Sequence, residues 1–419
     1  MMQPSHPVPL TRRHLLLGAA SLGAAGLLAA CGGGGGDAEA APAGGGGSGA
    51  SFASGPITGF GSIIVGGVRF DDSVARVEGD DGQTRRRDEL KLGSVVEIEG
   101  GRLDRALGLC TAMRVVLGHS LLGPRDDATL GASSLVLLGQ TVVVTDRTVF
   151  DASVPGGTLD GIKQGDVVEA HALYDPADLQ FIATRLEVKT GVTEYRLRGP
   201  ATSIDTANRT FMLGTEAIYY GNALPAVQGS ALFEGAFVRV HLQTAKDTVR
   251  DAWVATRLRV GLRALQLRND AEAEVEGVVA RFVSLQDFTV NGMPVDASGA
   301  SFPDGSAGVV AGARVEVSGT IVDGVLVATQ VELEDSRRGG NMGGQPRDRM
   351  PFEFHGAISG LDTGTKTFAL RGMTIWYGGT VEYRNGTEAN LADGRRVEVK
   401  GVMAADRQRI EARLIEFES

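Results

Sequence analysis

The sequence predicts an all-β protein made of five tandem, small antiparallel β-barrels that follow a disordered N-terminal tether. Three observations predict this fold class. Apolar and polar residues alternate with a period of two over many short segments, which is typical of half-buried strands. Signals of helices are nearly absent. Glycine contributes 60 of the 419 residues, about twice its usual share of ~7 %, and glycines stand at bends between the segments.

The first element along the chain is an export signal, residues 1–30. Arg12 and Arg13 precede an apolar stretch, and the pair resembles a twin-arginine export signal. The stretch ends in Leu-Ala-Ala-Cys, which resembles a bacterial lipobox with Cys31 as the lipidated residue. The two resemblances imply an exported lipoprotein anchored in the membrane through Cys31. An uncleaved or ordinary signal is the alternative.

Residues 31–54 read as a flexible tether, because a run of glycines and small residues cannot bury a core. Such a tether would hold a folded body away from a membrane surface. The residue after the cysteine is Gly32 and not an aspartate, which by the sorting of bacterial lipoproteins implies the outer membrane. The periplasmic face and exposure at the cell surface stay open.

The body repeats one unit at intervals of about 70–80 residues. Each copy has a glycine followed by an alternating strand, as in Gly-Ala-Arg-Val-Glu-Val-Ser of the fourth copy. The five glycines are Gly93, Gly165, Gly235, Gly312 and Gly394. A second strand follows after a turn, as in Ala-Thr-Gln-Val-Glu-Leu from Ala328.

Two-residue turns separate the strands within a copy. Asp323-Gly324 predicts a hairpin between the two strands just described, and Asn291-Gly292 and Arg371-Gly372 predict turns in the stretch upstream of them. Each copy then has about five strands and one short helical turn, such as the one before Gly93. This content suits a partly closed barrel of the oligonucleotide/oligosaccharide-binding (OB) type, whose closure hides strand edges. A string of small β-sandwiches is the alternative.

The predicted boundaries follow from these copies. After the signal at 1–30 and the tether at 31–54, the repeats span 55–118, 119–192, 193–263, 264–335 and 351–419, and a linker rich in glycine and arginine spans 336–350.

Two features of the sequence carry a resemblance to a known family. They are the opening Gly55-Pro-Ile-Thr-Gly-Phe-Gly-Ser-Ile-Ile-Val-Gly-Gly-Val-Arg-Phe-Asp and the repeated frame Gly-x-x-Val-x-Val followed by Ala-Thr-x-Val-x-Val. In both features the chain resembles the bacterial domain of unknown function 5666 family. The resemblance covers roughly residues 55–419, and the second and third copies match least well. The resemblance implies exported proteins with several OB-like units. It implies no catalytic residues.

Composition and motifs exclude several classes of function. A net charge of −10 disfavours nucleic acid as a partner, because such binding draws on clustered lysine and arginine. Two cysteines cannot build a disulfide scaffold or a thiolate zinc site, and no histidines stand at the spacing of a local metal pair. Motifs of a serine nucleophile or a phosphate loop are also absent. The sequence therefore predicts no catalytic residue, no cofactor and no metal site.

Alignment of the copies assigns single residues to the core or the surface. Cys110 aligns with Phe181, Trp253, Leu326 and Ile410, which predicts a core position for Cys110 and for Trp253. His171 and His241 lie six residues after their repeat glycines. Other copies carry Glu99, Ser318 and Lys400 there, so both histidines are predicted at the surface.

Two aromatic residues are the candidate ligand-binding residues. Tyr219 and Trp376 occupy one position in the third and fifth copies, and alternation directs them outward while Ile218, Tyr220 and their counterparts Ile375 and Tyr377 point inward. An exposed aromatic ring on a barrel can stack on a sugar or a peptide. Packing between repeats is the alternative.

These observations together predict a non-enzymatic lipoprotein of the cell envelope that binds or scaffolds through its repeats. The expected partners are the membrane, through Cys31, and a glycan or an envelope protein. A purely structural spacer is the main alternative, and an envelope enzyme or carbohydrate-processing accessory is the weaker one.

Overall fold

The computed structural model describes residues 51–104, 109–118, 120–126, 133–221, 223, 232–260, 269–333 and 351–418. The predicted signal with Arg12 and Arg13, the lipidation site Cys31 and the linker at 336–350 lie outside these residues. Gly46–Ser419 form one compact unit. No described helix is long and apolar enough to cross a membrane.

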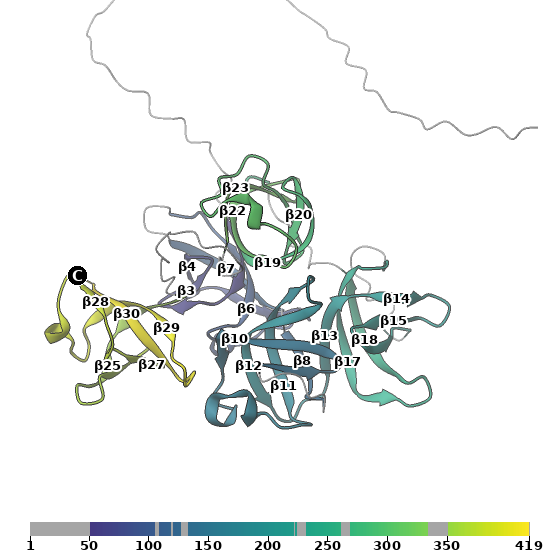
Figure 1. The fold of residues 1–419 in the computed structure, drawn as a ribbon, viewed down its shortest axis with the longest axis horizontal. Coiled ribbons are helices and arrows are strands. Elements are labelled where there is room, and N and C mark those ends of the chain that lie inside the picture. Colours follow the sequence, from purple (N-terminus) through teal and green to yellow (C-terminus); the bar gives the residue numbers. More distant parts are fainter. Residues whose placement is uncertain are drawn as a thin grey trace, which may run out of the picture. The chain divides into compact units, whose positions relative to one another are not determined.

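The described strands fall into five groups in chain order, which we call the first to fifth barrels (Figure 1). The first barrel has β1 (Ser51–Pro56), β2 (Gly59–Phe60), β3 (Ile63–Val65), β4 (Val68–Asp71), β5 (Arg76–Gly79), β6 (Val95–Gly100) and β7 (Leu109–Leu117). The second has β8 (Ser120–Pro124), β9 (Ser134–Leu137), β10 (Gln140–Phe150), β11 (Val167–Asp175) and β12 (Gln180–Lys189). The third has β13 (Tyr195–Pro200), β14 (Thr202–Asp205), β15 (Thr210–Leu213), β16 (Glu216–Tyr219), β17 (Phe237–Asp247) and β18 (Ala252–Val260).

The last two barrels follow the same pattern. The fourth has β19 (Glu272–Ser284), β20 (Asp287–Val290), β21 (Met293–Asp296), β22 (Arg314–Val322) and β23 (Val325–Leu333). The fifth has β24 (Phe352–Ala357), β25 (Ser359–Asp362), β26 (Thr367–Leu370), β27 (Met373–Trp376), β28 (Glu382–Arg384), β29 (Arg396–Met403) and β30 (Arg409–Phe417). Short 3₁₀ turns precede β6, β11, β22 and β29, each the second-to-last strand of its barrel: η1 (Arg87–Glu89), η2 (Pro155–Gly157) with η3 (Leu159–Gly161), η4 (Ser306–Gly308) and η5 (Glu388–Asn390).

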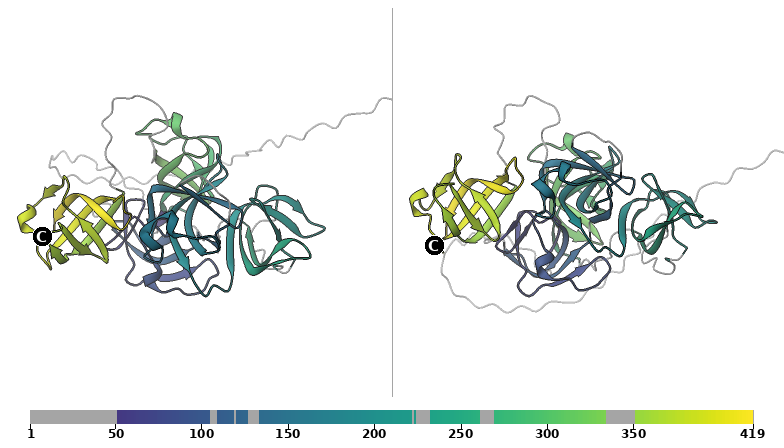
Figure 2. Two further views of the ribbon diagram at one scale, coloured as in Figure 1. Left: turned by 60° about the horizontal axis from the view of Figure 1, so that its bottom comes forward. Right: turned by 90° about the horizontal axis from the view of Figure 1, so that it is seen from below.

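One strand order recurs in all five barrels. In the fourth barrel β19 pairs with β20 and with β22, β20 pairs with β21, and β22 pairs with β23, all antiparallel. β21 lies parallel to β23 and closes the ring. In the first, third and fifth barrels two short strands take the place of β19: β1 with β2, β13 with β14, and β24 with β25. Counted in this way, the third strand (β4, β10, β16 or β27) again lies parallel to the fifth strand (β7, β12, β18 or β30). In the first and fifth barrels β5 and β28 add a second parallel pair with that last strand. The predicted all-β, OB-like fold is therefore confirmed, and Figure 2 shows the yellow strands of the fifth barrel curled in this way.

The strand register confirms the alignment of the copies. The residue aligned with Cys110 always lies opposite an inward residue of the third strand. The pairs are Phe70–Cys110, Val142–Phe181, Ile218–Trp253, Val295–Leu326 and Ile375–Ile410. Cys110 is buried, as predicted, whereas Trp253 lies at the margin of the core and donates its indole N–H to Glu216 at 2.8 Å.

The predicted turns are also confirmed. Asn291-Gly292 and Arg371-Gly372 each join two antiparallel strands, and the first residue of each pair has a positive φ, 52° and 53°. Asp323-Gly324 connects β22 and β23, with a φ of 50° at Asp323. These are left-handed conformations that asparagine and aspartate tolerate better than arginine does.

The start of the first barrel differs from the prediction. β1 begins at Ser51, inside the segment predicted as tether, and it pairs with β6 on one edge and with β19 of the fourth barrel on the other. Phe52 and Ala53 are buried there. The small residues of this strand resemble the low-complexity sequence before Ser51, so the sequence pattern did not indicate a strand. Small residues fit here because β1 lies between two neighbouring strands.

Strand edges also join the barrels to one another. β1 lies parallel to β19, and β2 lies parallel to β24, so the first strands of the first, fourth and fifth barrels pair. Arg196 of β13 pairs with Leu122 of β8, which links the second and third barrels. The barrels therefore share hydrogen bonds across their edges, which also covers edges that would otherwise be open.

Candidate functional site

The outward aromatic residues end the third strands of two barrels. Tyr219 is the last residue of β16, and Trp376 is the last residue of β27. Both side chains are half-buried, while their neighbours Ile218 and Ile375 are fully buried. The predicted inward and outward directions are therefore confirmed.

An arginine of the same barrel lies over each ring. The guanidinium carbon of Arg250 is 4.4 Å from the ring centroid of Tyr219, and that of Arg409 is 5.3 Å from the ring centroid of Trp376. Arg250 lies in the hairpin that leads into β18, and Arg409 is the first residue of β30. The two barrels thus present the same cation–aromatic pair at the same place.

A glycine lies against each ring as well. A Cβ atom on Gly221 would collide with the phenol of Tyr219, and one on Gly378 would collide with the indole of Trp376. Each ring therefore packs between a glycine and an arginine of its own barrel. These glycine and arginine contacts lie within one barrel and not between repeats. The role of Tyr219 and Trp376 in ligand binding stays a prediction.

The prediction of surface positions for His171 and His241 is wrong, because each is only 6 % exposed. Alternation directs both side chains out of their own barrels, but other barrels cover these faces. Near His171, Thr184 of the second barrel donates to the Gly93 carbonyl of the first barrel at 2.6 Å, and Arg185 donates to the Leu92 carbonyl at 3.0 Å. Periodicity within one repeat could not reveal a cover that another repeat supplies.

His171 is held neutral in a polar recess of about 370 Å³. Burial lowers the pKa of His171 to about 4, against the pull of the nearby Glu169 carboxylate. Its Nδ1 has no hydrogen-bond partner among the described groups. Glu169 itself pairs with Arg196 at 2.6 Å and with Lys189 at 3.0 Å, so the charges around the imidazole are mutually satisfied.

His241 has the opposite electrostatic environment. Burial opposes its charge, but hydrogen bonds to Asp80 and Glu194 outweigh this effect and raise the pKa of His241. Its Nδ1 lies 2.9 Å from Glu194, and its Nε2 lies 3.5 Å from Asp80 of the first barrel. Partial burial would raise the pKa of Asp80, but the hydrogen bond with His241 and its charge lower that pKa to about 2. This pair therefore links the first and third barrels.

Glu353, His355 and Glu398 bring potential metal-ligand atoms within 4.8 Å of one another. Lys400 already supplies a cation there, with its Nζ 3.1 Å from Glu353 and 3.0 Å from Glu398. His355 uses both ring nitrogens on carboxylates, Nε2 on Glu353 at 2.6 Å and Nδ1 on Glu418 at 3.0 Å. A metal ion would have to displace Lys400 and one of these bonds, so the group fits an ion-pair network better than a metal site.

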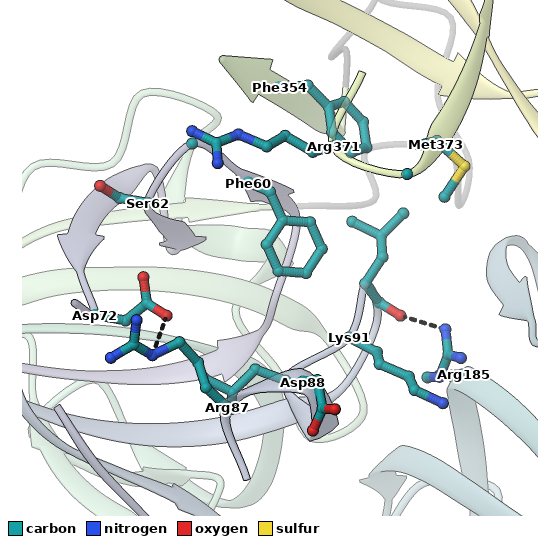
Figure 3. Close-up of a pocket in the computed structure, with 14 residues that line it drawn as sticks. Phe60, Ser62, Asp72, Arg87, Asp88, Lys91, Arg185, Phe354, Arg371 and Met373 are labelled. Carbon is teal, nitrogen blue, oxygen red and sulfur yellow. Dashed lines mark hydrogen bonds and ion pairs between the residues drawn. The ribbon is translucent and has the colours of Figure 1, made fainter. Parts of the chain in front are cut away.

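A cleft of about 660 Å³ opens where the first, second and fifth barrels meet (Figure 3). Phe60, Leu90, Leu92, Phe354 and Met373 form its apolar part. The charged side chains of its lining are Asp72, Arg87, Asp88, Lys91, Arg185 and Arg371. Cations outnumber acids in this lining, although the whole chain carries a net charge of −10.

Sequence reasoning missed this cleft, because its residues lie up to 313 positions apart and belong to three repeats. One signal was visible. At the turn position where the fourth copy has Asn291, the fifth copy has Arg371, a residue type that this turn does not favour.

Three stretches of the chain match a family model described as a domain of unknown function, DUF5666. They are residues 127–187, 276–332 and 355–416, and they fall in the second, fourth and fifth barrels. These three barrels are DUF5666 domains. The expectation that the second copy is among those that match the family least well is therefore wrong. The matched DUF5666 regions do not include the first copy, although its opening sequence suggested the family.

Comparison with solved structures adds little to the DUF5666 assignment. A Drosophila Unr structure, entitled CSD456, is 14 % identical over 55 % of this chain and 98 % of its own, with a TM-score of 0.12. A multidomain protein with nucleic acid binding domains from Streptococcus pneumoniae TIGR4 is 16 % identical over 53 % of this chain and 75 % of its own, with a TM-score of 0.14. Scores this low carry no argument, so the OB-like description of the DUF5666 domains rests on strand order. No curated protein matches the chain.

Proposed function

We propose that this DUF5666 protein is a non-enzymatic lipoprotein of the cell envelope that binds a polymeric glycan. Export through Arg12 and Arg13 and anchoring through Cys31 would place the barrels at a membrane surface, on a tether that keeps them within reach of the envelope. The sequence motifs support export and anchoring. The absence of nucleophile and metal-ligand motifs from the sequence supports the non-enzymatic part.

The recurrent arginine–aromatic pair supports the binding role. Tyr219 and Trp376 occupy the same outer position at the ends of β16 and β27, and Arg250 and Arg409 lie over their rings. OB barrels bind oligomers on the face of their second and third strands. An aromatic ring beside a guanidinium offers a flat apolar surface next to hydrogen-bond donors, which suits a sugar ring.

Charge favours a glycan over a nucleic acid at these faces. Arg250 is paired with Asp247 at 2.5 Å, and Arg409 is paired with Asp406 at 3.2 Å. These acids cancel much of the positive charge that a polyanion would need. Two equivalent faces on one chain also suit a repeating polymer, because the second contact then becomes intramolecular.

A sedimentation experiment tests this proposal. The full chain with Cys31→Ser would be mixed with insoluble cell-wall glycan and, separately, titrated with soluble envelope polysaccharide and with single-stranded DNA. We expect the chain to bind a glycan and to leave the DNA unbound at physiological salt. Failure to bind any envelope glycan, or tighter binding to DNA, would contradict the proposal.

A structural spacer is the second candidate. The edge pairing of β1 with β19 and of β2 with β24 supports it, because shared edges make the barrels a stable unit without any ligand. A spacer needs no outward aromatic residue, so substitution of Trp376 distinguishes the two candidates.

A further inference from the structure

We propose that the cleft between the first, second and fifth barrels binds a small anionic sugar, with Arg371 holding its carboxylate or phosphate and Phe60 packing against its ring. This site is separate from the outward faces of Tyr219 and Trp376, and neither proposal depends on the other. Arg371 lies before β27, whereas Trp376 is at the far end of that strand.

Arg371 performs a structural task for which an arginine is not needed. Its Nε donates to the His355 carbonyl of the first strand at 3.1 Å. In the fourth barrel the equivalent residue, Asn291, donates its side-chain N–H to the Glu276 carbonyl at 2.7 Å. The shorter side chain therefore anchors the same turn. The two terminal guanidinium nitrogens of Arg371 take no part in this hydrogen bond.

The backbone at Arg371 also favours a different residue. Its φ of 53° lies in the left-handed region, where asparagine and glycine are more stable than arginine. An arginine at this position thus costs conformational energy and gains no ion pair in return among the described residues. This combination points to a partner outside the chain.

The other cations of the cleft are occupied. Arg87 lies 3.6 Å from Asp72 and donates to the Ser73 carbonyl. Lys91 lies 3.3 Å from Asp151, and Arg185 pairs with the same carboxylate.

Glu187 neutralises Lys91 and Arg185 further, at 3.4 and 2.5 Å. Among the cations that line the cleft, Arg371 therefore differs: within the described part of the chain, its hydrogen bond goes to a backbone carbonyl and no carboxylate pairs with it. An anion that enters the cleft would pair with it, and a guanidinium can hold a carboxylate or phosphate through two parallel hydrogen bonds.

Phe60 supplies the apolar contact. Its ring is half-buried and packs against the cores of the first and fifth barrels. In Figure 3 the ring lies in the middle of the cleft, with Arg371 on one side and Arg87 and Lys91 on the other. A cleft of about 660 Å³ is within the size range of small-molecule sites. The ligand class therefore combines one anionic group with one ring-shaped apolar face.

Calorimetric titration of the full chain with Cys31→Ser tests the proposal. The probes are galacturonate, glucose 6-phosphate, neutral galactose and inorganic phosphate. We expect at least one of the two anionic sugars to bind, and galactose and inorganic phosphate to bind at least roughly tenfold more weakly. The preference between the two sugars shows whether the natural anion is a carboxylate or a phosphate. Equal binding of inorganic phosphate would overturn the role of Phe60.

Variants at the turn separate binding from folding. Arg371→Asn copies the fourth barrel, so we expect an unchanged or slightly higher melting temperature and about a ten- to a hundredfold loss of affinity for the anionic sugar. Arg384→Asn is the matched control, because Arg384 is an exposed arginine of the same barrel outside the cleft and should leave affinity unchanged. Phe60→Leu should weaken binding roughly three- to tenfold. Absence of binding by both anionic sugars, or full affinity in Arg371→Asn, would overturn the proposal.

Discussion

Arg239 of the third barrel and Glu97 of the first barrel form a buried ion pair of 3.2 Å, although 142 residues separate them in the chain. Their side chains are 5 % and 2 % exposed. Arg198 is buried beside them, and burial together with the charge of Arg239 lowers the pKa of Arg198 to about 9. Glu97 is therefore a counter-charge for two buried guanidinium groups.

Glu97→Gln should destabilise the chain by about 3–5 kcal/mol, because it leaves buried positive charge without its partner. Chemical denaturation of the chain with Cys31→Ser measures the loss. Glu99→Gln, two residues along β6, removes a carboxylate that is 38 % exposed and should cost less than about 1 kcal/mol. An equally small loss of stability in Glu97→Gln and Glu99→Gln would show that the ion pair between the first and third barrels does not stabilise the chain.

Cys110 should resist thiol reagents in the folded chain and react after denaturation. It is 1 % exposed, and burial raises the pKa of its thiol, so little thiolate is available. Labelling of the chain with Cys31→Ser, with and without denaturant, measures this difference. Rapid labelling of the folded chain would contradict the register that places Cys110 opposite Phe70.

Substitutions at Cys110 should follow its surroundings. Cys110→Val should cost about 1–2 kcal/mol, chiefly because the Ser51 hydroxyl, 2.9 Å from the sulfur, loses its partner. Cys110→Asp should cost several kcal/mol more, because it buries an unpaired carboxylate. Thermal unfolding of both variants checks the order.

His171 should make the chain sensitive to acid. Its pKa is about 4 in the folded chain and about 6.5 when unfolded, so between these values only the unfolded chain takes up the proton. The free energy of unfolding should therefore fall by up to about 3 kcal/mol as the pH falls from about 6.5 to 4. His171→Leu should lack this part of the decline. The same acid profile in the variant and the parent chain would contradict the burial of a neutral imidazole.

His241 should show the opposite dependence. Hydrogen bonds to Asp80 and Glu194 raise the pKa of His241 in the folded chain. The contribution of His241 to the free energy of unfolding is therefore fully present below its unfolded pKa, and it is lost as the pH rises through its folded pKa. His241→Gln should therefore lose stability at acid and neutral pH and match the parent chain at alkaline pH. Unfolding curves recorded across that range distinguish the two histidines.

Cys31→Ala should abolish membrane association and leave an exported, unanchored body, since the prediction assigns the lipid to that cysteine. Metabolic labelling with a palmitate analogue measures the anchor. Label that persists on the variant would contradict the lipobox interpretation, because the sequence has one other cysteine, Cys110, and it is buried.

Much of each barrel could be predicted from its sequence because its signals are local. Alternation gave the inward residues, and Asn-Gly and Asp-Gly pairs gave the turns. The alignment of Cys110 with Ile410 predicted a shared core position, which the register bears out. These features depend on contacts within one repeat.

Features that depend on two or three repeats could not be predicted in this way. His171 and His241 point out of their own barrels, and the barrels that cover them lie elsewhere in the chain. The cleft around Phe60 and Arg371 has the same origin, as does β1, which gains its second partner strand from the fourth barrel. Whether an outward residue of one repeat is buried by another repeat can be predicted only when the packing between the repeats is known.

The affinity of Trp376→Ala for the envelope glycan that the parent chain binds tests the central claim most directly. Loss of a stacking ring should weaken binding about ten- to a hundredfold, and Tyr219→Ala should have an effect of the same order. Both variants should keep the fold, with at most a modest fall in melting temperature, because each ring is only half-buried and lies outside the core of its barrel. Undiminished affinity in Trp376→Ala, with a large fall in melting temperature, would contradict the account and leave the spacer as the better description.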